Sequence, residues 1–407
     1  MKKLFILLIF VVALLPNSAN AATMQASKSL IDLPYTKSDQ VSDLLLTPVS
    51  ILLVGTTESP SSSWINGALG GLSDGFITSY SSIGAPLWNL RLGGASDEIA
   101  TSAAIDSDGS IWVLGASSAP AIASATTLPG KVLNPDNVII EPQPPTATSL
   151  KLIKLWQVSN TGNLLNTFEF PIENIINPKK ILISGSNLLI IGNLYEKSSV
   201  VGFFTSVTKT GSFSPIVKVG SKNTSLNDAI LNSEGSLTAV GASGELLMKV
   251  KPISRADAVT LKISATGVLQ QVARATLKGT TRSWSSIDLG LLQAGKVTYA
   301  NKTEAAITKF SALNKPVWNV RYPSKSSALV AVGKNSWATF VSAGAIKNIT
   351  AWRPKAATGV VLEFGKKGEI LSAYALSVPA VAITANNDIG TVVITDSGVS
   401  FGLVVIN

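Results

Sequence analysis

Two consecutive stretches of the sequence decide the fold. Residues 74–94 read DGFITSYSSIGAPLWNLRLGG, and residues 100–118 read ATSAAIDSDGSIWVLGASS. In each stretch, two runs of alternating apolar and polar residues flank a short turn rich in Gly, Ser, Asp or Asn, which is the signature of a β-hairpin. The two hairpins together predict one four-stranded antiparallel unit.

Both hairpin types recur along the chain. The first type begins with strands such as FITSY at 76–80 and VTLKI at 259–263, and the second ends with strands such as ILLVG at 51–55 and LTAVG at 237–241. Seven copies of each type predict an all-β fold, a seven-bladed β-propeller of four-stranded antiparallel blades. Two separate β-sandwiches are the alternative.

The two ends of the chain favour a closed ring. The seventh unit stops at Asn407 without a fourth strand, whereas the segment SLIDL at 29–33 is a spare strand before the first hairpin. We therefore expect the N-terminal strand to complete the seventh blade and close the ring, because closure removes the unpaired edges that invite aggregation.

The unit resembles the SBBP-type β-propeller repeats of secreted bacterial proteins. The residues that carry the resemblance are Asp74, Gly75, Phe76, Gly84, Trp88, Gly93, Gly94, Asp97, Ala104, Asp106, Gly109, Val113 and Gly115. Trp88 returns as Trp318, but the Gly93-Gly94 pair does not return, so later units follow the pattern rather than the motif. The resemblance implies a fold and an exported location but no reaction.

The first 21 residues read as a signal peptide. Lys2 and Lys3 precede an apolar run at 4–15, which Pro16 ends, and Ala19-Asn20-Ala21 matches a small-x-small cleavage pattern. The run is shorter than the about 20 residues of a membrane anchor, the alternative reading. We expect residues 22–407 to form a single propeller domain, with a Pro-rich inserted loop at 119–149. It would be monomeric, without a membrane span after cleavage, and secreted, extracellular or associated with the cell envelope, the periplasm included.

The composition excludes several classes of site. The chain has neither histidine nor cysteine, which excludes Ser-His-Asp triads, cysteine nucleophiles and ordinary zinc sites. The segment Asp106-Ser107-Asp108-Gly109 is similar to the start of a calcium loop, but Ser117 stands where the loop needs glutamate. We therefore predict no metal, no cofactor and no enzymatic activity.

Charge is the most informative functional signal. Residues 22–150 carry 4 basic and 11 acidic side chains, whereas residues 249–367 carry 19 basic and 4 acidic ones. Since units follow one another around a ring, this predicts an acidic sector beside a basic crescent. A basic surface attracts polyanions, although lysines that only keep the protein soluble are the alternative.

Long loops on a rigid scaffold are common binding sites, and three loops supply candidates here. The insertion at 243–256 carries basic residues, and Trp352 lies in a second basic loop, while Trp64 lies in a long loop before residue 73. The candidate binding residues are Trp64, Trp352, Arg353, Lys355, Lys249, Lys251 and Arg255.

These observations predict a non-enzymatic exported β-propeller that binds a macromolecular partner or an anionic cell-envelope polymer such as an acidic polysaccharide. One alternative is a carbohydrate-active hydrolase or lyase, with carboxylate, arginine and tyrosine side chains at the central mouth of the ring. A purely structural surface or assembly protein is the other alternative.

Overall fold

The computed structural model describes residues 21–118 and 149–406 of the chain. These residues form thirty β-strands, one short 3-10 helix, η1 (Leu289–Leu291), and no α-helix. None of their helical structure has the length and hydropathy needed to cross a bilayer. Residues 1–20 of the predicted signal peptide at 1–21 lie outside the described residues, as does all but the last residue of the Pro-rich insertion at 119–149.

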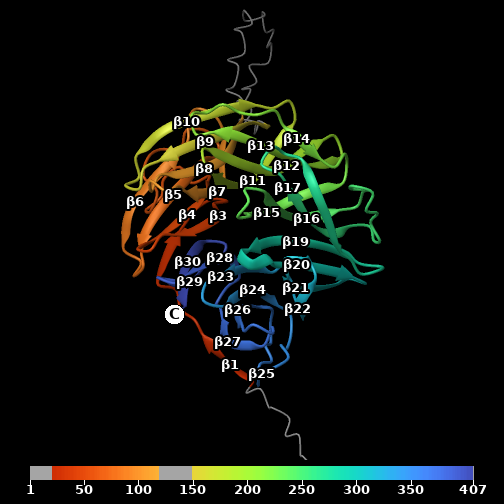
Figure 1. Ribbon diagram of the computed structural model, residues 1–407. Helices are drawn as coiled ribbons and strands as arrows, with labels where there is room; N and C mark the ends of the chain where they lie inside the picture. The colour runs from red at the N-terminus through yellow and green to blue at the C-terminus, as the bar shows by residue number, and fades with distance from the viewer. Residues whose placement is uncertain (1–20, 119–148, 407) are drawn as a thin grey trace, which may run out of the picture.

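The strands form seven sheets, which follow one another around the molecule in chain order, from the orange β3–β6 sheet through green to the blue β28–β30 sheet (Figure 1). Six of the sheets are four-stranded antiparallel blades. Their strands are β3 (Gln40–Leu46), β4 (Ser50–Thr57), β5 (Asp74–Ser81) and β6 (Pro86–Leu92); β7 (Glu98–Ile105), β8 (Ile111–Ser118), β9 (Leu150–Val158) and β10 (Leu164–Pro171); β11 (Ile175–Ser184), β12 (Asn187–Glu196), β13 (Ser199–Thr208) and β14 (Val217–Val219); β15 (Thr224–Leu231), β16 (Leu237–Ser243), β17 (Asp257–Ile263) and β18 (Leu269–Ala275); β19 (Thr281–Asp288), β20 (Leu292–Tyr299), β21 (Lys302–Phe310) and β22 (Pro316–Pro323); and β28 (Ala380–Asn386), β29 (Gly390–Asp396), β30 (Ser400–Ile406) and β2 (Ile31–Pro34).

The remaining sheet differs from the other six. Its strands are β23 (Leu329–Val332), β24 (Ser336–Ser342), β26 (Thr358–Phe364), β27 (Ile370–Ala375), β1 (Ala22–Ala26) and β25 (Ile349–Thr350). The strand β1 runs parallel to both β27 and β25. The fold is thus a β-propeller, but the expectation of seven four-stranded blades is wrong. Six blades have four strands, and an N-terminal strand and a loop strand extend the other sheet to six.

The N-terminal strand closes the ring as expected. The strand β2 pairs antiparallel with β30, with Ile31 opposite Leu403, and so completes the blade that the C-terminal end of the chain leaves open. Just after β2, the Tyr35 hydroxyl donates a 2.6 Å hydrogen bond to Asp396. Burial and this hydrogen bond raise the pKa of Tyr35 to about 12. Chain segments more than 360 residues apart are thereby joined by backbone and side-chain hydrogen bonds.

A close approach between the first two strands of a sheet explains the glycine that recurs in the second strand. The first strand carries a β-bulge, for example between Val41 and Asp43 of β3, opposite Gly55 of β4. A Cβ atom on Gly55 would lie 2.0 Å from the Gln40 carbonyl oxygen, and one on Gly115 would lie 1.9 Å from that of Ile99. No side chain fits there, so the position requires glycine.

The apolar core lies between the faces of neighbouring sheets. Several of the second and third strands of the blades are almost wholly buried, as in the second strands β4 and β8 and the third strand β5. One core cluster joins Phe76 of β5 to Phe401 of β30 across the closure of the ring. Because each sheet packs on the next, the outermost strands are left to face solvent, and β10 is mostly exposed.

Candidate functional site

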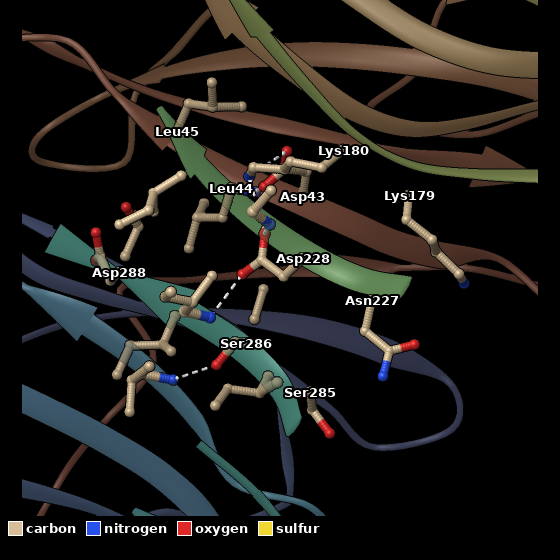
Figure 2. Close-up of a pocket in the computed structure, with 18 of the residues that line it drawn as sticks. Asp43, Leu44, Leu45, Lys179, Lys180, Asn227, Asp228, Ser285, Ser286 and Asp288 are labelled. Carbon is tan, nitrogen blue, oxygen red and sulfur yellow. Dashed lines mark hydrogen bonds and ion pairs between the residues drawn. The ribbon is translucent and has the colours of Figure 1, made fainter. Parts of the chain in front are cut away.

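A cavity of about 550 Å³ lies at the centre of the ring. Its walls are formed by the first strand of every sheet, namely β3, β7, β11, β15, β19, β23 and β28. Several charged side chains line it, and Figure 2 shows Asp43, Lys180 and Asp228 lying together while Lys179 and Asn227 lie apart from them. The central mouth is therefore charged, as the hydrolase alternative requires.

Lys180 pairs with two of the carboxylates at the centre. The Lys180 ammonium lies 3.4 Å from an Asp43 carboxylate oxygen and 4.0 Å from an Asp228 oxygen. Burial disfavours the charged form of Lys180, but Asp43 and Asp228 outweigh it and raise its pKa. Burial raises the pKa of Asp228 to about 6, although Lys180 opposes this shift. Burial also raises the pKa of Asp288, further along β19.

The carboxylates also link neighbouring sheets through backbone N–H groups. An Asp43 oxygen on β3 accepts hydrogen bonds from the Ala103 N–H at 3.0 Å and the Ser102 hydroxyl at 2.7 Å, both on β7. Asp228 on β15 accepts one from the Ile287 N–H of β19 at 2.9 Å. The inner strands of a propeller do not pair with one another, so these side chains satisfy backbone groups that would otherwise face the cavity unpaired.

The hydroxyl of Ser286 follows the same rule. It lies on β19 at the position after the bulge, and its oxygen accepts a hydrogen bond from the Val330 N–H of β23 at 2.9 Å, which Figure 2 marks. A polar side chain after the bulge thus ties one inner strand to the next at several points around the ring. Through these hydrogen bonds, Asp43, Asp228 and Ser286 hold neighbouring inner strands together.

Sequence reasoning missed the central charges, although a signal was present. Asp43 and Lys180 each precede the recurring glycine of their unit by 12 residues, and Ser102 and Asp228 precede it by 13. Aligning the units on that glycine places the four polar side chains within one residue of one another on the inner strand. What the alignment does not show is which way that position faces, because the bulge shifts the alternation by one residue.

The cavity lacks part of what the hydrolase alternative expects. Neither arginine nor tyrosine occurs among the described residues that line it. In the part of the chain that the structure describes, no group of three or more potential metal ligands occurs either. The carboxylates present already accept backbone hydrogen bonds, so little of their hydrogen-bonding capacity is directed at a ligand.

Trp64 does not have the exposed position that the sequence suggested. Its side chain is 7% exposed. The indole packs edge-on against Phe76, with 5.1 Å between ring centroids, and also against Phe401. Its Nε1–H donates a 2.8 Å hydrogen bond to the Pro34 carbonyl. The long loop folds back over the closure of the ring and gives Trp64 a core role, so the prediction of a contact residue is corrected.

Trp352 occupies an intermediate position in the loop between β24 and β26. It is half-buried and packs against the core of the six-stranded sheet, whereas its neighbours Arg353 and Lys355 are exposed. Lys249, Lys251 and Arg255 are also exposed, in the loop between β16 and β17. The structure thus separates the predicted set into one core residue, one half-buried residue and five exposed cations.

The five cations lie on the same face of the ring. In antiparallel blades, the link between the second and third strands and the link to the next sheet leave from the same end. From β16 to β26, the exposed cations on this face are Lys249, Lys251, Arg255, Lys278, Lys302, Lys325, Lys347, Arg353 and Lys355. We call this set the cationic face.

The cationic face contains almost no negative charge. The links from β16 to β26 at this end contain a single acidic residue, Glu245, and it is buried. The corresponding links of the earlier sheets are mixed, with exposed Glu58 and Glu173 as well as Lys197 and Lys222. This end of three consecutive sheets thus holds nine of the 19 basic residues of the predicted basic crescent, whereas Lys315, Lys334, Lys366 and Lys367 lie at the opposite end.

The comparisons with known proteins identify no relative by sequence, since no family model and no curated protein matches the chain. Among solved structures it is similar to a protein from Lactobacillus plantarum, with 12% identity, a TM-score of 0.49 and 88% and 92% of the two chains covered. It is similar to a protein of unknown function from Bacteroides caccae, with 12% identity, a TM-score of 0.36, and 84% and 83% covered. A glucose dehydrogenase is matched at 8% identity and a TM-score of 0.38, over 63% of this chain and 92% of that one. Likenesses this distant carry no argument about activity.

Proposed function

We propose that this protein is a non-enzymatic binding β-propeller that holds an anionic polymer on its cationic face. The observation that carries the proposal is the separation of charge within the molecule. Nine exposed cations gather at one end of three consecutive sheets, while the only acidic residue of the links there is buried. An array of this kind attracts a polyanion by displacing its bound counterions, with no need for a shaped pocket.

Export belongs to the same proposal. The N-terminal lysines and the apolar run at 4–15 predict a signal peptide, and the resemblance to SBBP-type repeats stays a prediction with the same implication. Outside the cytoplasm, the polymers that match a cationic face are acidic polysaccharides and phosphate-rich polymers of the cell envelope. The hydrolase alternative has less support, because the central carboxylates are hydrogen-bonded to strands and paired with Lys180.

The proposal is tested by binding of the mature chain to polyphosphate and to dextran sulfate, with uncharged dextran as the control polymer. We expect binding to both polyanions and a steep loss of affinity as salt is raised. The variant K278Q/K325Q/K347Q/K355Q removes four charges from the cationic face, and should weaken binding at low salt at least about 10-fold.

A matched control removes the same number of charges from the opposite face of the same region. Lys315, Lys334, Lys366 and Lys367 are exposed in turns at the other end of the blades. We expect the variant K315Q/K334Q/K366Q/K367Q to lose less than about threefold. Equal losses in both variants would mean that net charge alone governs binding. Failure of the wild-type protein to bind either polyanion would contradict the proposal and favour a purely structural role.

A further inference from the structure

The loop between β16 and β17, residues 244–256, exposes an unusual number of apolar side chains. Ile253 is 64% exposed, Leu246 56% and Met248 50%, and Leu277 of the next link is 42% exposed. Ser254 ties the two segments together, since its hydroxyl donates a 2.9 Å hydrogen bond to the Leu277 carbonyl. Single exposed apolar residues are ordinary, but a group on one projecting loop marks an interaction surface.

The tip of this loop has a defined conformation. The backbone of Leu247 and Val250 is joined by two hydrogen bonds, of 3.2 and 2.7 Å. Between them, Met248 and Lys249 both have positive φ angles, of 44° and 64°, the geometry of a two-residue hairpin turn that normally selects Gly or Asn. The turn directs Met248 and Lys249 outward while the Leu247 side chain is buried in the core. We call residues 246–253 the finger.

Buried charges hold the finger to the blade. The guanidinium of Arg274 donates to the Ser243 carbonyl at 2.9 Å, to the Val250 carbonyl at 3.4 Å and to the Glu245 carbonyl. It also pairs with Asp257, whose carboxylate accepts a hydrogen bond from the Ile253 N–H at 2.8 Å. The finger is anchored at both of its ends, so its apolar side chains are presented with little loss of conformational entropy on binding.

The Glu245 side chain adds an anchor on the preceding link. Its carboxylate accepts hydrogen bonds from the Ser221 N–H, the Asn223 N–H and the Thr224 hydroxyl. Burial opposes ionisation of Glu245, but hydrogen bonds from Ser221, Thr224 and Asn223 outweigh it and lower its pKa to about 2. The carboxylate is therefore ionised, and its oxygens accept hydrogen bonds within the protein.

Cations alternate with the apolar residues along this segment. Lys249 and Lys251 lie within the finger and Arg255 follows it, all exposed. Among the described residues, none of the three forms an ion pair. A soluble polyanion would match the charges but would leave Leu246, Met248 and Ile253 in water. The two kinds of side chain are both satisfied at the interface of an anionic lipid bilayer, where apolar groups enter beneath the headgroups and cations meet lipid phosphate.

We propose that the finger binds the surface of an anionic lipid bilayer, inserting Leu246, Met248 and Ile253 while Lys249 and Lys251 contact lipid headgroups. This inference goes beyond the proposed function, because its ligand is a lipid surface and not a polymer. The other cations of the cationic face would then lie against the same surface and add electrostatic attraction. Insertion of the finger would orient the ring with its cationic face toward the membrane.

The test compares co-sedimentation of the mature chain with vesicles of phosphatidylcholine alone and with vesicles containing 30% phosphatidylglycerol, a fraction of about one anionic lipid in three. Binding is expected only to the anionic vesicles. The variant M248S/I253S keeps every charge of the finger and removes two of the three apolar side chains that would insert. We expect its partitioning to the anionic vesicles to fall at least about 10-fold, with polyphosphate binding changed less than about twofold.

The matched control is I83S/L313S, which replaces two even more exposed apolar residues in turns at the other face and should bind vesicles like the wild type. Vesicle binding that M248S/I253S leaves unchanged would overturn the inference. Binding to polyphosphate without vesicle binding would overturn it too, and would leave the proposed function intact. If polyglutamate beads retained the protein through Met248 and Ile253 and vesicles did not, the finger would bind an acidic polypeptide instead.

Discussion

The centre of the ring and the finger use lysine in opposite ways. At the centre, Lys180 lies within 4.0 Å of two carboxylates and its charge is neutralised inside the fold. On the finger, Lys249 and Lys251 are exposed and form no ion pair with any described residue. The residue type is the same. The charge of Lys180 pairs with carboxylates on other inner strands, whereas the charges of Lys249 and Lys251 remain available to a ligand. Position relative to the inner strands, and not the presence of charge, distinguishes the paired lysine of the fold from the lysines for which we propose a ligand.

The largest expected effect comes from removing the central lysine. The variant Lys180→Met leaves Asp43 and Asp228 as uncompensated charges in a partly closed cavity, and should lower the free energy of unfolding by about 3–5 kcal/mol at pH 7.5. Urea denaturation measures it. The control Lys262→Met breaks the exposed ion pair with Glu234 and should cost less than about 1 kcal/mol. Similar losses of stability in Lys180→Met and Lys262→Met would contradict the distinction between the central lysine and exposed lysines.

The pH dependence of the free energy of unfolding tests the role of Lys180 further. Because the pKa of Asp228 is raised to about 6 in the fold, its protonated form is favoured there, and the stability it contributes falls as pH rises through 6. In Lys180→Met, a protonated Asp228 is no longer an unpaired charge. The loss should therefore be smaller at pH 5 than at pH 7.5, by about 1 kcal/mol or more. In the double variant with Asp228→Asn, this difference should disappear.

An intermediate effect is expected from the anchor of the finger. The variant Glu245→Gln removes a carboxylate that accepts several hydrogen bonds, and should lower the free energy of unfolding by about 2 kcal/mol at pH 7. Since the pKa of Glu245 is lowered to about 2, its contribution is present above the ordinary value of about 4.5 and is lost as pH falls toward 2.

The exposed Glu173 offers the control for that measurement. Glu173→Gln should change stability by less than about 0.5 kcal/mol. Chemical denaturation from pH 7 down to pH 2.5 would show the curves of wild type and Glu245→Gln converging at low pH. Parallel curves over this whole range would show that the ionised carboxylate is not what holds the finger.

The smallest expected effect on stability belongs to the finger's own cations. The variant K249Q/K251Q should unfold within about 0.5 kcal/mol of the wild type, because exposed unpaired lysines contribute little to stability. Thermal and urea denaturation both test this. A loss above about 1 kcal/mol would mean that these lysines, like Lys180, serve the fold, and would remove the contrast between the two regions.

The sequence alone determined the repeat, its strands and the closure of the ring. Alternation with period two identifies strands such as β5 and β17, and the spare segment before the first hairpin predicts that β2 completes the last blade. These features are local, because the pattern of each strand reports its own half-buried surface. The excess of basic residues at 249–367 is likewise readable in the sequence, whereas the end of the sheets at which each of them lies is not.

Tertiary structure alone decided the rest. It decided that β1 joins a six-stranded sheet, that Trp64 belongs to the core, and that Lys180 lies between Asp43 and Asp228. It also decided that Met248 and Ile253 face solvent although both are apolar. The physical reason is that burial and pairing depend on which strands become neighbours, and bulges and long loops change that without changing the local pattern.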